Sequence, residues 1–161
     1  MKKNKVKTTL IAIAVILLSA LTITGCFAVI PKAEVVPSEY DEGITFEQAS
    51  KEDKPILTVF YVDWCTYCKR LMPKLDKVRN IQRNNMNVVL INMDNPDNES
   101  FAKKYKVSGY PTIYIIDPKY NNRVHIPGVF TDSVLDFNAE VTKYINFRKL
   151  IKKNESCQKQ I

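Results

Sequence analysis

The chain has 161 residues and a formal net charge of +7, from 24 lysines and arginines against 17 aspartates and glutamates. Four of the lysines lie within the first seven residues, so the rest of the chain holds 20 basic and 17 acidic side chains. This near balance is ordinary for a globular surface and argues against a nucleic acid as partner.

The N-terminus has the pattern of a secretion signal, a basic segment followed by 24 uncharged residues at positions 8–31. The apolar stretch contains Ile23-Thr24-Gly25-Cys26, which resembles the lipobox of bacterial lipoproteins. That resemblance implies cleavage before Cys26 and acylation of this cysteine. We therefore expect a signal peptide at residues 1–25 and a lipid on Cys26.

An uncleaved membrane anchor is the alternative, because Thr8–Ile30 as a helix would be about 35 Å long and could span a hydrocarbon core of about 30 Å. In both interpretations the lysines stay inside and the folded domain lies outside the cytoplasm. We expect a bacterial cell-envelope location, with the domain facing the periplasm or the cell exterior, where disulfides are permitted.

Residues 26–43 contain two prolines and no sustained period, which predicts a tether. A short helix is expected after Ile44, with Thr45 as its cap. The domain itself is expected at residues 44–151, long enough for one core, and a polar tail at residues 152–161.

Alternating strand and helix patterns fill the domain. Strands are predicted at Ile56–Val62, Asn87–Met93, Thr112–Ile116 and Arg123–Val129, and helices at Cys65–Arg83, Asn98–Lys106 and Asp132–Ile151. The first two strands are nearly all apolar, which favours parallel neighbours covered on both faces. A β-α-β unit followed by a hairpin and a helix predicts an α/β fold with a central mixed sheet flanked by helices.

Cys65 and Cys68 lie where the first strand leads into the first long helix. A thiol near a helix N-terminus is favoured as a thiolate, and a second thiol one turn later is close enough for a short disulfide. The pair is therefore expected to be redox-active, with Cys65 as the attacking nucleophile and Cys68 as the resolving thiol.

The segment Trp64-Cys65-Thr66-Tyr67-Cys68-Lys69, with Pro73 five residues after the second cysteine, resembles the active-site motif of the thioredoxin family. Gly109-Tyr110-Pro111-Thr112 resembles the family's Gly-x-Pro-Thr turn. The resemblance implies a thioredoxin fold, a cis bond before Pro111, and substrate contacts through Trp64, Tyr110 and Pro111. Gly109 is expected to supply backbone freedom before this turn, and Gly128 to allow close approach on the same face.

Three positions depart from the family pattern. Val59 stands where thioredoxin has a buried aspartate, and Leu90 stands where it has the accompanying lysine. The dipeptide between the cysteines is Thr66-Tyr67 rather than Gly-Pro. Thioredoxin itself is therefore a poor guide to the reduction potential.

These observations predict an extracytoplasmic thiol–disulfide oxidoreductase that acts on protein thiols or disulfides, with reduction as the favoured direction. It would need no cofactor beyond its redox-active disulfide, but would need a membrane or soluble redox partner. The alternative is a binding or chaperone module whose cysteine pair senses redox state. A metal site is not expected, because His125 is the single histidine and no second cysteine pair is present. Cys157 is expected to be an incidental exposed thiol or a partner in a mixed disulfide.

Overall fold

The computed structural model describes residues 34–158 of the chain. The predicted signal peptide at residues 1–25, the lipobox cysteine Cys26 and the alternative anchor at Thr8–Ile30 all lie outside this range. Within residues 34–158, no helix is both long enough and apolar enough to cross a bilayer.

Four strands form one sheet in the order β2-β1-β3-β4. They are β1 (Ile56–Tyr61), β2 (Asn87–Asn92), β3 (Thr112–Asp117) and β4 (Asn122–Ile126). β1 pairs in parallel with β2 and antiparallel with β3, and β4 pairs antiparallel with β3. The predicted mixed sheet and the parallel pairing of its first two strands are thus confirmed.

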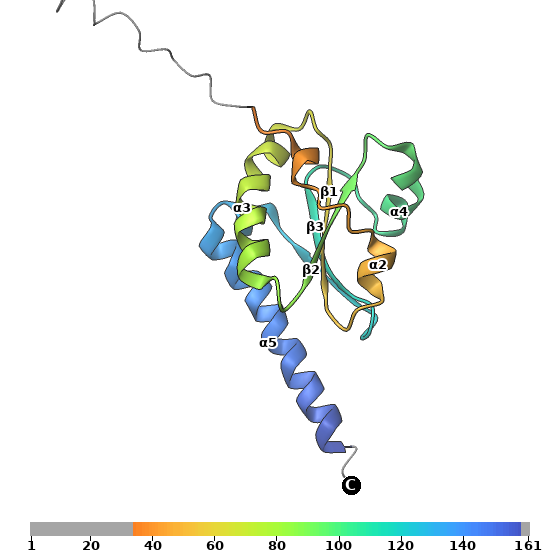
Figure 1. Cartoon of the computed structure of the whole chain (residues 1–161), viewed down its shortest axis with the longest axis vertical. Coiled ribbons are helices and arrows are strands. Elements are labelled where there is room, and N and C mark those ends of the chain that lie inside the picture. The colour runs from red at the N-terminus through yellow and green to blue at the C-terminus, as the bar shows by residue number, and fades with distance from the viewer. Residues whose placement is uncertain (1–33, 159–161) are drawn as a thin grey trace, which may run out of the picture. The chain divides into compact units, whose positions relative to one another are not determined.

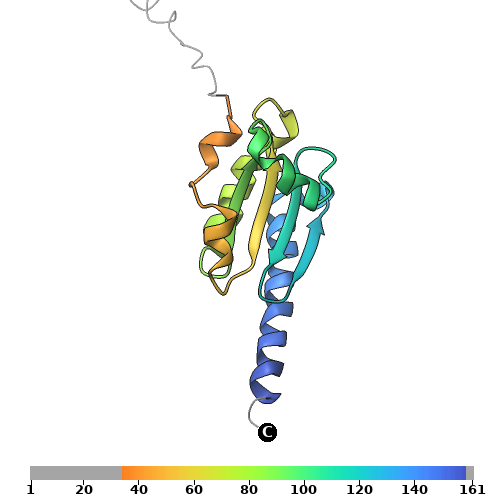
Figure 2. The same ribbon diagram turned by 90° about the vertical axis from the view of Figure 1, so that its right-hand side faces the viewer.

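Helices cover both faces of this sheet (Figure 1). The long helices α3 (Thr66–Gln82) and α5 (Val134–Gln158) pack against one face, and the short helices α2 (Phe46–Ser50) and α4 (Glu99–Lys104) pack against the other. Figure 2, turned by 90°, looks onto the sheet, with α2 and α4 in front of the strands and α5 behind them. Single 3-10 turns lie at η1 (Pro37–Tyr40), η2 (Pro96–Asn98) and η3 (Gly128–Thr131).

The residues of β1 alternate between two cores. Leu57, Val59 and Tyr61 belong to the core beneath α3 and α5, whereas Ile56 and Phe60 belong to the core beneath α2 and α4. All six residues of β1 are buried, because a central strand with helices on both faces has no side open to water. This explains its unbroken apolar sequence.

Rings pack together in the second core, at centroid separations between 4.8 and 6.4 Å: Phe46, Phe60, Phe101, Tyr105 and Tyr114. Helix α2, which delivers Phe46, begins with a capping box between Thr45 and Gln48. The cap expected at Thr45 is therefore confirmed, and it orients this short helix over the sheet.

Two boundaries differ by more than two residues from the sequence-based prediction. Helix α5 continues beyond Ile151 to Gln158, because its Lys, Glu and Gln residues are good helix formers although they bury little. The last strand ends at Ile126 rather than Val129, since Pro127 follows and a 3-10 turn begins at Gly128. The predicted polar tail is thus mostly the exposed end of α5, and it carries Cys157.

The segment expected to be a free tether up to Gly43 in fact packs onto the domain from Val35 onward. Pro37 is buried, and Val35 and Tyr40 lie against the core beneath α3 and α5. Residues from Val35 onward accordingly belong to one compact unit with the sheet. The apolar side chains at these positions follow neither a helical nor a strand period. The sequence pattern therefore did not predict that this segment packs onto the domain.

Candidate active site

Cys65 is the N-cap of α3, with an extended backbone conformation and a side chain that accepts a hydrogen bond from the Cys68 N–H at 3.3 Å. A cap residue satisfies one of the four backbone N–H groups left open at a helix start. Here the accepting atom is a sulfur. The Cys65 sulfur therefore lies at the N-terminal end of α3, beside the positive end of the helix dipole.

Cys68 lies one turn further along and is completely buried, whereas Cys65 is 8% exposed. The pair therefore presents only its first sulfur to an incoming group. Burial, and then the contact with Cys65, raise the pKa of the Cys68 thiol above its ordinary value. The difference in exposure leaves the Cys65 sulfur accessible and Cys68 behind it, while the attacking role of Cys65 and the resolving role of Cys68 stay predictions.

The environment of Cys68 is apolar. Val59 and Leu90 face each other in the β1–β2 register and share the core that contains Cys68. Both are buried. The two positions at which the sequence departs from the thioredoxin pattern therefore hold neither a carboxylate nor a lysine.

The Tyr110–Pro111 peptide bond is cis, as the sequence resemblance led us to expect. It lies just before β3, and the Tyr110 carbonyl accepts a hydrogen bond from the Cys65 Sγ at 3.4 Å. Residues 45 apart in sequence therefore meet at the nucleophile. Both Tyr110 and Pro111 are half-buried, so part of their surface remains open beside Cys65.

Trp64 lies on the surface beside the pair and is 71% exposed. Its indole N–H donates to Asp94 Oδ1 at 3.1 Å, and Asp94 Oδ2 accepts from the Asp63 backbone N–H at 3.0 Å. One carboxylate at the end of β2 thereby holds two consecutive residues of the loop before Cys65. Tyr67, within the motif, is also largely exposed.

The two glycines near the site have no close neighbours within the chain. A Cβ placed on Gly109 or Gly128 would meet no atom within 4 Å, and neither residue has a positive φ angle. The expected backbone freedom at Gly109 and close approach at Gly128 stay predictions. The Gly109 carbonyl accepts a hydrogen bond from Thr112 Oγ1 at 2.7 Å, which ties the turn before β3 to the strand.

Among residues 34–158 no group of three or more His, Cys, Asp or Glu side chains is arranged to hold a metal ion. His125 is exposed on the edge strand β4, where its ring lies 5.3 Å from that of Tyr114.

Comparison with known families identifies the chain. The family model described as Thioredoxin matches residues 31–143. The chain belongs to the thioredoxin family. The matched range includes the cysteine pair and the cis-proline turn, and it begins before Val35, in agreement with the packing of the N-terminal segment.

Relatives of this thioredoxin-family chain include the rice (Oryza sativa subsp. japonica) protein disulfide isomerase-like 2-2, 38% identical over 96 residues, which cover 58% of this chain and 24% of the relative. Another is the chloroplastic thioredoxin-like protein HCF164 of rice, 31% identical over 83 residues, which cover 52% of this chain and 32% of the relative. The chain thus spans a quarter to a third of the length of these two proteins. Among solved structures, chloroplastic thioredoxin z has a TM-score of 0.52 at 25% identity, with 64% of this chain and 91% of that chain covered.

Sequence reasoning missed two residues that shape the site, Asp94 and Ser38. A signal existed for Asp94, because it follows a predicted parallel strand adjacent to β1, and the carboxyl ends of parallel neighbours meet at one edge of a sheet. Ser38 offered none, since it acts through its backbone N–H, which donates to Asp63 Oδ1 at 2.8 Å.

Proposed function

We propose that this chain is a membrane-tethered thiol–disulfide oxidoreductase that acts outside the cytoplasm and reduces disulfides of protein substrates. The observation that carries the proposal is the arrangement of three groups: the Cys65 sulfur caps α3, the buried Cys68 lies behind it, and the cis Tyr110–Pro111 turn lies beside it.

The chemistry is a two-electron exchange in two steps. The Cys65 thiolate attacks one sulfur of a substrate disulfide, whose S–S bond breaks, and the other substrate sulfur leaves as a thiolate that takes a proton from water. Cys68 then loses its proton and attacks Cys65, which forms the Cys65–Cys68 disulfide and releases the second substrate thiolate. The substrate gains two electrons, and a partner dithiol must return the pair to its reduced form.

A contact surface for a polypeptide substrate surrounds Cys65. Trp64 and Tyr67 supply exposed aromatic area, and the half-buried Tyr110 and Pro111 flank the sulfur on the other side. Pro111 has no backbone N–H, so polar groups of the neighbouring residue remain to pair with an extended segment. Trp64, Tyr110 and Pro111 are accordingly the proposed substrate-binding residues.

One feature supports the reducing direction. Strong oxidants of this class owe their potential to a reduced form stabilised by a very acidic thiolate. In this chain burial, and then the contact with Cys65, raise the pKa of the Cys68 thiol. Ionisation of Cys68 therefore does not stabilise the reduced pair.

The proposed location rests on the N-terminal sequence, a basic segment, an apolar stretch and the lipobox-like Ile23-Thr24-Gly25-Cys26. Acylation of Cys26 would leave the domain on the outer side of the membrane. In that compartment a redox pair has disulfide-bonded substrates available.

The deciding experiment is the reduction potential of the Cys65–Cys68 pair in the full chain, equilibrated against glutathione buffers. A potential near about −270 mV supports a reductase supplied with electrons by a partner, and one near about −120 mV overturns the proposed direction. If the pair cannot be cycled, the enzyme interpretation fails. Binding of an unfolded polypeptide that survives Cys65→Ser would then favour the alternative, a binding module with a redox sensor.

A further inference from the structure

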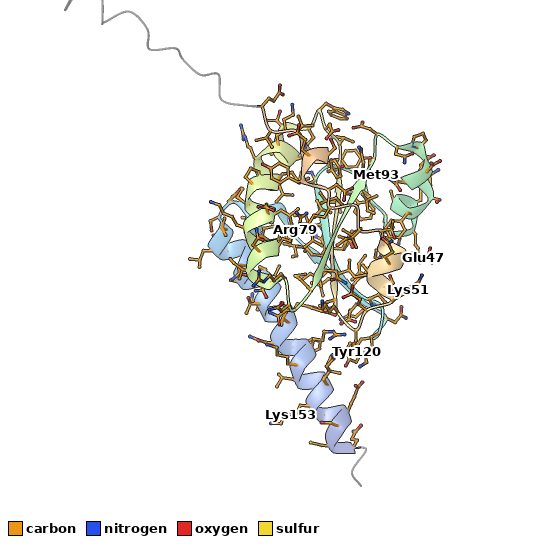
Figure 3. All side chains as sticks on the ribbon, in the orientation of Figure 1. Glu47, Lys51, Arg79, Met93, Tyr120 and Lys153 are labelled. Carbon is orange, nitrogen blue, oxygen red and sulfur yellow. The ribbon has the colours of Figure 1, made fainter. Side chains whose placement is uncertain are left out.

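Residues 35–42 pack onto the domain ahead of α2, and we call this segment the N-terminal strap. It is held along α3 by buried apolar groups and by Arg79, whose Nη2 donates to the Tyr40 carbonyl at 2.8 Å and whose Nη1 lies 3.3 Å from the Glu42 carboxylate. Pro37 within the strap is buried. Figure 3 labels Arg79 on α3. The strap therefore enters the fold at a defined place.

The strap joins the domain at the end that carries the Cys65–Cys68 pair. The Ser38 backbone N–H donates to Asp63 Oδ1 at 2.8 Å, and Asp63 stands two positions before Cys65 in sequence. In Figures 1 and 2 the strap begins beside the N-terminal end of α3, whereas the C-terminal end of α5 lies at the opposite end of the domain. The chain thus meets the domain close to its nucleophile.

The sequence limits how far this end can move from Cys26. Nine residue steps join Cys26 to Val35, and a chain of that length reaches at most about 30 Å. Attachment at the far end of the domain would add a domain diameter, roughly 35 Å for a unit of this size. The entry point of the strap is therefore the feature that keeps the nucleophile near the anchor.

We propose that the strap confines the Cys65–Cys68 pair to the layer next to the bilayer, so that its substrates or redox partner are disulfides and thiols carried at the membrane surface. The occupant we commit to is a membrane-attached protein, rather than a protein free in solution. This inference rests on the proposed membrane tether. The inference adds to that proposal the class of partner that the cysteine pair can reach.

The test uses the full chain with its N-terminal segment, purified from membranes, reconstituted in phosphatidylcholine–phosphatidylethanolamine vesicles and reduced beforehand. The probe is a disulfide-bridged fluorophore–quencher peptide, either linked to a phosphatidylethanolamine head group in the same vesicles or free in solution. A single turnover passes two electrons from the pair to the probe disulfide, which separates fluorophore from quencher.

We expect the unmodified chain to reduce the vesicle-linked probe faster than the free probe. A 30-residue Gly-Ser insertion between Glu34 and Val35 should lower this preference about tenfold, because effective concentration falls roughly as the −3/2 power of tether length. The matched control is the same insertion after Ile161, which leaves the tether unchanged and should leave the preference unchanged.

The outcomes separate this inference from the proposed function. The inference alone is overturned if an anchored chain reduces the free probe normally but shows no preference for the vesicle-linked probe. It is also overturned if that preference persists after the N-terminal insertion. A chain that does not float with the vesicles overturns the membrane tether and the inference with it. A reduced pair that reacts with neither probe overturns the enzyme proposal, and the inference falls as well.

Discussion

Cys68 must lose a proton before it can attack Cys65, and within residues 34–158 the core cluster that contains Cys68 includes no carboxylate to take that proton. Val59 and Leu90 stand side by side in the core around it, and burial raises the pKa of the thiol. The resolving step is therefore expected to be slow in this chain compared with its first step. A mixed disulfide with substrate should have a measurable lifetime.

Val59→Asp tests this. A carboxylate at this position should shorten the lifetime of a mixed disulfide between Cys65 and a thionitrobenzoate or peptide thiol by about tenfold or more, since it can act as a general base. The same change should lower the free energy of unfolding by about 2–4 kcal/mol, because it buries a carboxylate. Stopped-flow absorbance measures the lifetime. Val59→Asn is the uncharged control, and equal lifetimes in the two variants would contradict the explanation.

Asp94 offers a second test at the residue scale, because it binds the Trp64 indole and the Asp63 N–H with its two oxygens. Asp94→Ala should release the indole, lower the unfolding free energy by about 1–3 kcal/mol and slow the reduction of a protein disulfide more than that of a small disulfide. Trp64 is the single tryptophan, so its fluorescence reports the change directly. Asp97→Ala, at a nearby exposed position, is the control and should leave all three readouts unchanged.

At the scale of elements, α5 is locked to the sheet by charge. Arg148 Nε lies 2.5 Å from Asp117 Oδ2, and Tyr144 donates to the same oxygen at 3.3 Å. Asp117 is fully buried at the end of β3, and the Arg148 side chain is 8% exposed. Removing one partner of such a pair leaves an uncompensated charge in the core.

Arg148→Ala should accordingly lower the unfolding free energy by about 3–5 kcal/mol, measured by urea denaturation. The double variant Asp117→Asn/Arg148→Met should recover much of this loss, since it removes both charges. The rescue distinguishes an unpaired carboxylate from simple loss of packing. If the double variant is as unstable as Arg148→Ala, the electrostatic explanation is wrong.

Arg148 Nη2 also binds Asp53 Oδ1 at 2.6 Å, and this ion pair predicts a pH dependence. A hydrogen bond from Lys152, which has the larger effect, and one from Arg148 lower the pKa of Asp53 well below its ordinary value. A carboxyl group whose pKa is depressed in the folded state stabilises that state above its unfolded pKa of about 4, and this stabilisation is lost as the pH falls. The urea midpoint of the wild type should therefore decrease below about pH 4 by more than that of Asp53→Asn. The difference should be small, because the Asp53 side chain is 55% exposed. Glu47→Gln on α2 is the control for loss of one carboxylate.

At the scale of the whole molecule, the two ends of the described chain contribute unequally to stability. The strap buries Pro37 and is bound by Arg79, whereas the end of α5 beyond Arg148 contains no buried residue. Lys153 marks this projecting end in Figure 3. We expect the domain to need the strap and to tolerate loss of the projecting end.

Arg79→Ala should lower the unfolding free energy by about 1–2 kcal/mol through loss of its bonds to the strap. Lys77→Ala, an exposed position on the same helix, should change it by less than about 0.5 kcal/mol. Deletion of residues 153–161 should also have an effect of less than about 1 kcal/mol. Denaturant titrations of these three variants check the prediction, and a deletion as costly as Arg79→Ala would contradict it.

Much of this protein could be predicted from sequence because the deciding signals are local. The apolar run of β1, the cap at Thr45 and the position of Cys65 and Cys68 at a strand–helix junction depend on residues within one or two turns of each other. Hydrophobic periodicity and capping residues specify such features without knowledge of the rest of the fold.

The tertiary structure alone decided which distant groups surround the nucleophile. Tyr110 lies 45 residues from Cys65, Asp94 lies 30 residues from Trp64, and Ser38 lies 25 residues from Asp63. Two of these three contacts use backbone atoms, which every residue has, so no side-chain pattern marks them in the sequence. They form because the strand order brings the ends of β1 and β2 and the start of β3 to one edge of the sheet, where the strap along α3 also begins.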